Sequence, residues 1–248
     1  VSLADGTEIH AKCVASNADA NVTFLKLTDA KELPTEFLDA IRRIDYASAT
    51  VKINVALSEP PQFKALPGTG VGPQHHGTMH ICPDQDTIER AYDDAKYGRP
   101  AAVPMLECTM ATALDDSLAP PGKHILSMFV QYAPYRLAEG TWDTEADRFA
   151  DRCFDLLNEY APNFKASVIA RDVIPPPEME RRWGITGGNI MHGAMGPTSL
   201  FSFRPAAGFA NYRTPIRGLY LCGAAAHPGG GVVGAAGHNA ARAILQDG

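Results

Sequence analysis

The chain has 248 residues and a formal net charge of −6, and its composition is 45% hydrophobic and 20% charged. These values are ordinary for a globular protein with one large or two small domains, and they exclude a disordered or coiled-coil chain. Lysine and arginine are dispersed without a basic stripe, which argues against a nucleic-acid partner, and no apolar run is long enough to span a membrane.

The N-terminal part of the chain predicts a hairpin, a helix and a strand. The pair Asp5-Gly6 lies between two apolar runs, a hairpin signal whose second strand would cover about residues 10–15. Residues 34–46 predict a helix with one apolar face, and residues 51–57 alternate as in a half-buried strand. The proline- and glycine-rich residues 59–74 predict a loop.

The middle of the chain predicts alternating helices and strands. Apolar periodicity and boundary glycines or prolines place helices over 86–97 and 144–160, and strands over 104–110, 124–132 and 168–174. The residues that follow, 183–212, are irregular and glycine-rich. A loop system of that length suggests a function.

The most informative stretch covers residues 219–234. It predicts a short buried strand, a loop poor in side chains, and an alanine-rich helix that runs to about residue 246. The first N–H groups of such a helix lack backbone partners and carry partial positive charge, and glycines let a ligand approach the backbone. The stretch therefore predicts a cradle for an electron-rich ligand. Small or apolar residues follow the helical spacing at Val232, Ala235, Ala236, Ala240, Ala243 and Ile244.

The cradle formally contains a dinucleotide-binding fingerprint, Gly229-x-Gly231-x-x-Gly234. Only 14 residues follow Gly234, which leaves no room for the second strand and the ribose-binding acid of a self-contained Rossmann site. The alternative interpretation is a glycine- and alanine-rich helix packed tightly on a sheet.

Several polar residues are candidates for chemistry. Residues 75–82 gather three histidines and Cys82, a conceivable metal site whose spacing matches no common ligand pattern, so ordinary hydrogen bonds are favoured. His192 lies in a glycine-rich loop and would act as an acid, a base or a hydrogen-bond donor, or simply bond a nearby carbonyl. Arg204 would serve either a ligand or a structural salt bridge.

Residues 212–232 closely resemble the C-terminal flavin motif of the phytoene desaturase family, which belongs to the amine oxidase-type flavoproteins. Residues 14–19, 115–124 and 188–193 are similar to further segments of that family, in the same order along the chain. The resemblance therefore covers essentially the whole chain, and within the family it is strongest to a subgroup with animal and bacterial members.

The resemblance implies an α/β fold with an α+β substrate portion. An incomplete FAD-binding Rossmann-like domain would consist of residues 1–30 and 183–248, and residues 31–182 would form a mixed-sheet substrate domain. His192 would be a catalytic neighbour. The residues expected to contact the cofactor are Gly223, Ala224, His227, Pro228, Gly229, Gly230, Gly231, Val232 and Val233.

The family's first βαβ unit, with its glycine-rich loop, has no counterpart in this sequence. The chain is therefore expected to be the C-terminal portion of an FAD-dependent oxidoreductase, to need the missing N-terminal FAD-domain segment as its partner, and to bind FAD weakly or not at all by itself. The whole enzyme would transfer hydride from a small apolar or amine-type substrate to flavin. The alternatives are a flavin-dependent polyene isomerase or saturase, and a non-catalytic interaction or assembly module.

Five widely spaced cysteines without a C-x-x-C pair favour reduced thiols and a cytoplasmic location. A membrane surface is left open as a partner, although no pattern indicates it. The sequence does not indicate an oligomeric state.

Overall fold

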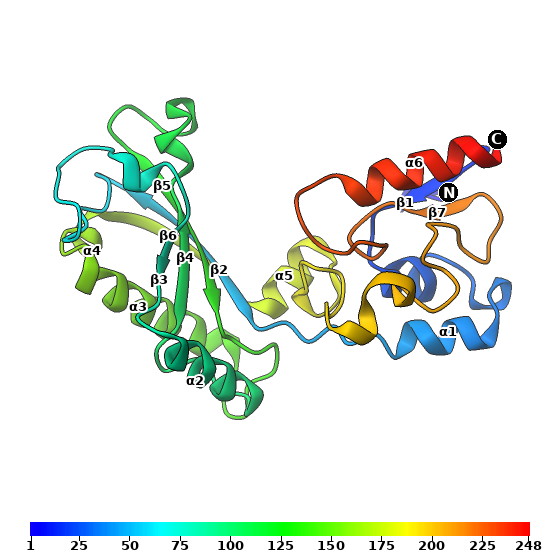
Figure 1. Cartoon of the computed structure of the whole chain (residues 1–248), viewed down its shortest axis with the longest axis horizontal. Helices are drawn as coiled ribbons and strands as arrows, with labels where there is room; N and C mark the ends of the chain where they lie inside the picture. Colours follow the sequence, from blue (N-terminus) through cyan, green and yellow to red (C-terminus); the bar gives the residue numbers. More distant parts are fainter. The chain divides into compact units, whose positions relative to one another are not determined.

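The computed structural model describes residues 1–248 and divides the chain into two compact units. Unit 1 combines Val1–Ala47 with Glu180–Gly248, and unit 2 is the intervening segment Ser48–Met179 (Figure 1). The expected boundary at residue 182 lies close to the observed one. The expected boundary at residue 30 differs more, because residues 31–47 pack with unit 1. The assignment of the units to FAD and to substrate stays a prediction.

Unit 2 is built on a five-stranded sheet in the order β3-β4-β5-β2-β6, and every neighbouring pair in it is antiparallel. The α/β class with both parallel and antiparallel pairing is confirmed. The expected mixed sheet is wrong for this unit, because the parallel pair belongs to unit 1. The strands are β2 (Thr50–Leu57), β3 (Met79–Ile81), β4 (Met105–Thr109), β5 (His124–Gln131) and β6 (Val168–Ile174).

Helices cover one face of this sheet. Strand β2 alternates strictly between buried and half-buried residues, as its sequence predicts, and its buried residues pack against the apolar stripe of α3 (Trp142–Tyr160). Completely buried Phe149 and Phe164 are among the largest side chains of this core, and each contributes about 1.5–3 kcal/mol through burial. The shorter helices of the unit are α2 (Gln85–Lys96) and α4 (Phe164–Ser167).

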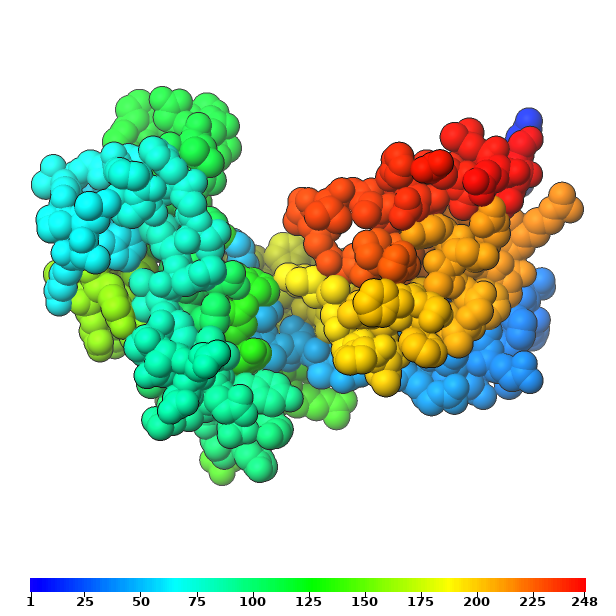
Figure 2. All heavy atoms as spheres, viewed as in Figure 1, coloured from blue at the N-terminus to red at the C-terminus, as the bar shows by residue number.

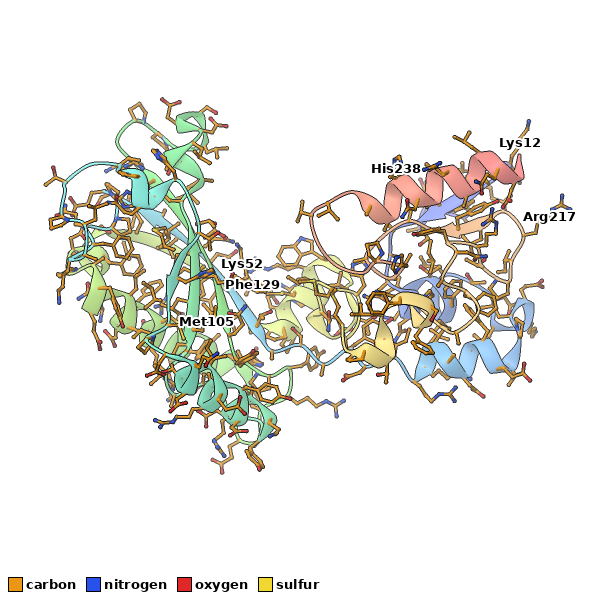
Figure 3. The ribbon with its side chains drawn as sticks, viewed as in Figure 1. Lys12, Lys52, Met105, Phe129, Arg217 and His238 are labelled. Atoms are coloured by element: carbon orange, nitrogen blue, oxygen red, sulfur yellow. The ribbon has the colours of Figure 1, made fainter.

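The opposite face of the sheet carries Lys52, Phe129 and Met105, which alternate with the buried residues of their strands (Figure 3). Lys52 and Phe129 stand opposite each other in the β2–β5 register. Burial lowers the pKa of Lys52, and its ammonium donates a hydrogen bond to Ser127 Oγ.

Unit 1 contains the only parallel pair, β1 (Val14–Ser16) with β7 (Leu219–Leu221). Helix α6 (Ala235–Asp247) lies along these strands, and α1 (Thr35–Arg42) lies on their other side (Figure 1). Phe24 and Phe37 meet edge to face at 4.8 Å between ring centroids, in a core that also includes Leu221. Because Phe37, Leu38 and Ile41 are buried in this core, α1 belongs to unit 1 rather than to the central segment.

Three differences from the expected elements have local causes. The Asp5-Gly6 turn does bring Ser2 opposite Glu8, but the expected second strand is wrong: residues 14–16 pair with β7 instead. A π-helix, Val22–Lys26, follows β1 and was not expected. The proline run 175–177 was expected only to end the preceding strand. Helix α5 (Pro176–Trp183) begins within it, because proline is tolerated in a first helical turn.

The five cysteines are free, and Cys108 and Cys153 are the two that pack as buried side chains. Burial raises the pKa of the Cys108 thiol to about 12. None of the helices combines the length and the apolar character needed to cross a bilayer.

Candidate functional site

The site begins where β1 and β7 end side by side. Cys222 donates its backbone N–H to the carbonyl of Ser16 at 2.9 Å, which extends the parallel pair by one step. The next residue is Gly223, and a Cβ placed there would lie 2.5 Å from the carbonyl oxygen of Asn17. The two chain segments therefore approach more closely at this point than any residue with a side chain would allow.

Two tight turns carry the chain away from β7. Ala226 donates its N–H to Gly223 O at 3.0 Å, and Gly229 donates to Ala226 O at 2.8 Å. Ala225 and Ala226 are buried between these turns. The sequence-predicted residues Ala224, His227 and Pro228 lie in the same two turns and are half-buried.

The loop then becomes exposed before α6 begins, and it lies at the surface of unit 1 (Figure 2). Gly231 would meet no atom within 4 Å if it carried a Cβ, and Val233 is 72% exposed. Gly234 caps α6 in the left-handed region at φ 67°, without a side-chain hydrogen bond. Val232 is also fully exposed and precedes the helix, so its expected place on the buried helical stripe is wrong; Ala240 and Ala243 are the buried residues of α6.

A second segment, residues 191–200, packs against this loop. A Cβ on Gly230 would overlap the side chain of Met191, and one on Gly229 would lie 3.0 Å from Met195 Cε. The absence of a side chain at these two glycines therefore allows Met191 and Met195 to pack against the loop. Of the three consecutive glycines, Gly231 is the one that faces open space.

Arg204 joins the two segments. Its side chain is 3% exposed and donates to four backbone carbonyls: Ala224 O at 2.8 Å, Ala194 O at 3.1 Å, Ser199 O at 3.2 Å, and Met191 O. Burial lowers the pKa of this guanidinium. The sequence offered two interpretations of Arg204, a cation for a ligand and a structural salt bridge. In the structure Arg204 instead holds the two loop segments together by bonding their carbonyls.

Two histidines lie in these segments with an unsatisfied ring nitrogen. Nδ1 of His192 and Nδ1 of His227 are both buried without a hydrogen-bond partner. His192 adopts a left-handed backbone conformation with φ 57°, and burial lowers the pKa of its imidazole against the opposing charge of Asp19. An unsatisfied buried nitrogen is uncommon and points to a ligand or a water at that position. The catalytic role expected for His192 stays a prediction.

The lowered pKa of His192 has a consequence for stability. As the pH falls to about 6.5 and below, the unfolded chain takes up a proton on this imidazole more readily than the folded chain does, because the pKa is lowered in the folded state. The unfolded state therefore binds more protons, and the free energy of unfolding falls as the pH falls. We expect His192→Gln to reduce this fall in urea unfolding measured between about pH 7.5 and pH 5.5. The exposed His238 on α6 (Figure 3) provides the control, because His238→Gln should leave the pH dependence unchanged. Identical slopes for wild type and His192→Gln would contradict the prediction.

Sequence reasoning missed Asp19, which anchors the end of β1. Its buried carboxylate accepts hydrogen bonds from Val22 N at 2.8 Å, Thr186 N at 2.8 Å and Thr186 Oγ1 at 3.1 Å. Nearby, Tyr46 accepts a hydrogen bond from Asn21 N at 3.0 Å, and burial raises the pKa of its phenol. The segment Ser16-Asn17-Ala18-Asp19 resembles the family, and Asp19 is its acidic residue, but the sequence alone does not indicate what that carboxylate bonds.

The histidines and Cys82 of residues 75–82 are not brought together. Nδ1 of His75 accepts from Gly72 N at 2.9 Å, and its Nε2 lies 2.8 Å from Pro61 O. His80 pairs with Glu107 at 3.1 Å, and Cys82 donates to Asp84 O. No group of three or more histidine, cysteine or acidic side chains is arranged to hold a metal ion.

The chain is similar to proteins of one known family. Residues 1–245 match the family described as flavin containing amine oxidoreductase. The chain is 46% identical to pyridine nucleotide-disulfide oxidoreductase domain-containing protein 2 of Mus musculus, over 100% of this chain and 44% of that protein. It is 26% identical to the lycopene-forming phytoene desaturase of Pseudescherichia vulneris, over 94% of this chain and 44% of that protein. The expected resemblance, including the subgroup, is confirmed.

The fold also has a solved counterpart. An oxidoreductase from Methanosarcina mazei superimposes with a TM-score of 0.55 at 18% sequence identity, over 97% of this chain and 44% of that structure. The chain thus spans less than half the length of the relatives it matches.

Proposed function

Because the chain belongs to the flavin containing amine oxidoreductase family, we propose that it supplies the flavin-ring half of an FAD site in an oxidoreductase. The observation that carries this proposal is the exposed glycine-rich loop in front of α6. That loop leaves the helix N-terminus uncapped by any side chain and leaves Gly231 open to a ligand. The family match covers both this loop and the segment that Arg204 ties to it.

The residues present fit a flavin ring. Helix α6 directs unpaired N–H groups and partial positive charge toward the loop, which favours a ring on which negative charge grows during reduction. Gly231, Val232 and Val233 would contact that ring through their backbone, and Nδ1 of His227 offers a further unsatisfied hydrogen-bonding group. The flavin supplies the redox chemistry when it is bound, and the protein supplies positioning and electrostatics.

We also propose that a further segment provides the adenosine half of the site and docks beside β1. The parallel pair β1–β7 is only two strands wide, whereas parallel sheets are normally larger and covered on both faces. A pocket of about 450 Å³ adjoins β1 and is lined by apolar Val14, Leu27 and Leu219. Lys12 and Arg217 flank it (Figure 3). The greater length of the relatives supports such a partner segment.

The proposed reaction removes a hydride from a C–H bond of a small apolar or amine-bearing substrate. His192 is a proposed acid or base for it, because burial lowers the pKa of its half-buried imidazole and its Nδ1 has no hydrogen-bond partner.

The flavin site is tested by a gain of binding. The chain alone should give no saturable quenching of FAD fluorescence at micromolar concentrations. Co-expressed with the part of the mouse relative that lies outside the matched region, it should retain yellow cofactor through purification. Val233→Glu places a carboxylate beside the uncapped N–H groups and should abolish that retention, whereas Leu245→Glu, equally exposed near the other end of α6, should not.

A yellow cofactor bound tightly by the chain alone would contradict the need for a partner segment. Equal retention by the two glutamate variants would contradict the placement of the flavin. Anaerobic product analysis of the reconstituted complex then separates net oxidation of substrate from isomerisation, and a complex that holds flavin but turns over neither substrate type would favour the non-catalytic module.

A further inference from the structure

Unit 1 contains a pocket of about 310 Å³ at the C-terminal end of α1, and His192, Arg204 and Ala225 of the candidate site contribute to its lining. The end of α1 and the residues just after it form one wall, and residues 198–207 form another. No residue of the loop 228–233 lines it. Its volume is at the lower end of the range for small-molecule sites and suits a compact ligand better than a dinucleotide or a polyene.

The pocket lining contains two arginines and one acid: Arg43, Arg204 and Asp45. The guanidinium of Arg204 is already bonded to four backbone carbonyls, so Arg43 and Asp45 are the two charged groups left for a ligand. Arg43 and Asp45 both line it, and the guanidinium of Arg43 makes no ion pair within 4.0 Å, with Asp45 or with any other acid. The carboxylate of Asp45 makes one hydrogen bond, from Ala47 N to its Oδ1 at 2.8 Å. By contrast, the neighbouring Arg42 is paired with Asp39 at 3.0 Å on the exposed surface of α1.

The rest of the lining offers one hydrogen-bonding ring, the polar residues Thr198 and Ser199, and an apolar wall. His192 contributes its imidazole, whose Nδ1 is buried and has no partner. The apolar wall is made of Ile44, Phe203, Pro205, Ala206, Ala207 and Ala225. A ligand that matches Arg43, Asp45 and this wall carries both charges and a short apolar side chain.

We infer that this pocket binds a small zwitterion, an α-amino acid with an apolar side chain, whose carboxylate pairs with Arg43 and whose ammonium pairs with Asp45. A dianion such as a dicarboxylate would be repelled by Asp45, and a diamine would be repelled by Arg43. The pocket shares His192 with the proposed reaction site. Binding of an amino acid is measured without flavin, so this inference and the proposed function can fail separately.

Calorimetric titration of the full chain with three matched probes tests the charge requirement. L-leucine carries both charges, 4-methylpentanoate lacks the ammonium, and 3-methylbutylamine lacks the carboxylate. We expect L-leucine to bind with a millimolar dissociation constant, and each analogue to bind about tenfold or more weakly, which corresponds to about 1.4 kcal/mol per lost ion pair.

Paired variants assign the charges to residues. Asp45→Asn keeps an oxygen that can accept the hydrogen bond from Ala47, and Arg43→Gln keeps a polar side chain of similar length, so both should fold while weakening L-leucine binding about tenfold. Asp39→Asn and Arg42→Gln remove the same kinds of charge from α1, just before the pocket residues, and should leave binding unchanged.

Three results would overturn the inference. They are the absence of saturable heat with L-leucine up to about 20 mM, equal affinity for L-leucine and either analogue, and equal loss of binding in the pocket variants and the surface controls.

Discussion

Replacement of Arg204 by leucine is expected to lower the free energy of unfolding of unit 1 by about 3 kcal/mol or more. The guanidinium donates to four carbonyls from two loop segments, and hydrogen bonds to a charged group contribute about 1.5–3 kcal/mol each before the cost of burying the charge is subtracted. Leucine would leave those carbonyls without donors in a partly buried setting. Urea unfolding, read by hydrogen exchange in peptides from residues 189–226, measures the loss in unit 1 itself.

Two companion variants make this result specific. Arg204→Lys retains the charge but cannot reach four carbonyls with one ammonium, so its loss of stability should lie between those of wild type and leucine. Arg242→Leu removes an exposed arginine from α6 and should change stability by less than about 0.5 kcal/mol. If Arg204→Leu is as stable as Arg242→Leu, the carbonyl clamp does not stabilise the unit.

A single methyl group at residue 223 is expected to cost about 1–3 kcal/mol or more. The Cβ of alanine in Gly223→Ala would lie 2.5 Å from the carbonyl oxygen of Asn17 and 3.0 Å from that residue's carbonyl carbon and Cα. All of these atoms are backbone, so the clash is relieved only if the ends of β1 and β7 separate. Thermal unfolding and hydrogen exchange of residues 14–17 report that separation.

Gly196→Ala is the matched control, since a Cβ there meets no atom within 4 Å and the backbone has an ordinary φ of −79°. It should be neutral or slightly stabilising, because alanine restricts the unfolded chain more than glycine does. Equal stability of the two alanine variants would show that the strand ends can move apart freely.

The sequence predicts most of unit 2 because its signals are local. Alternation in residues 51–57 and the apolar stripe of residues 144–160 correspond to β2 and α3 within two residues at each end. Unit 1 is less predictable because its segments depend on distant partners. Residues 10–15 have hairpin character beside Asp5-Gly6, but β1 is defined by pairing with β7 far along the chain, which no local pattern encodes.

The sequence indicates a candidate segment for the site but not the contacts of its individual residues. The glycines of residues 229–231 predict close approach of a ligand, which stays a prediction. The structure shows that Gly229 and Gly230 face the protein's own methionines, whereas Gly231 faces open space. The role of Arg204 could not be predicted, because its partners are carbonyls, and every residue has one. The assignment of individual residues to the cofactor stays a prediction.

The insertion of unit 2 into unit 1 sets an order for folding during synthesis. All contacts of Ser48–Met179 can form as soon as that segment leaves the ribosome, but β1 must wait for residues 219–221. At about 5–20 residues per second, the roughly 200 residues between them take about 10–40 s to make. Throughout that interval Phe24 and Phe37 lack the C-terminal part of their core, so the nascent chain exposes these apolar side chains to aggregation and benefits from a chaperone there.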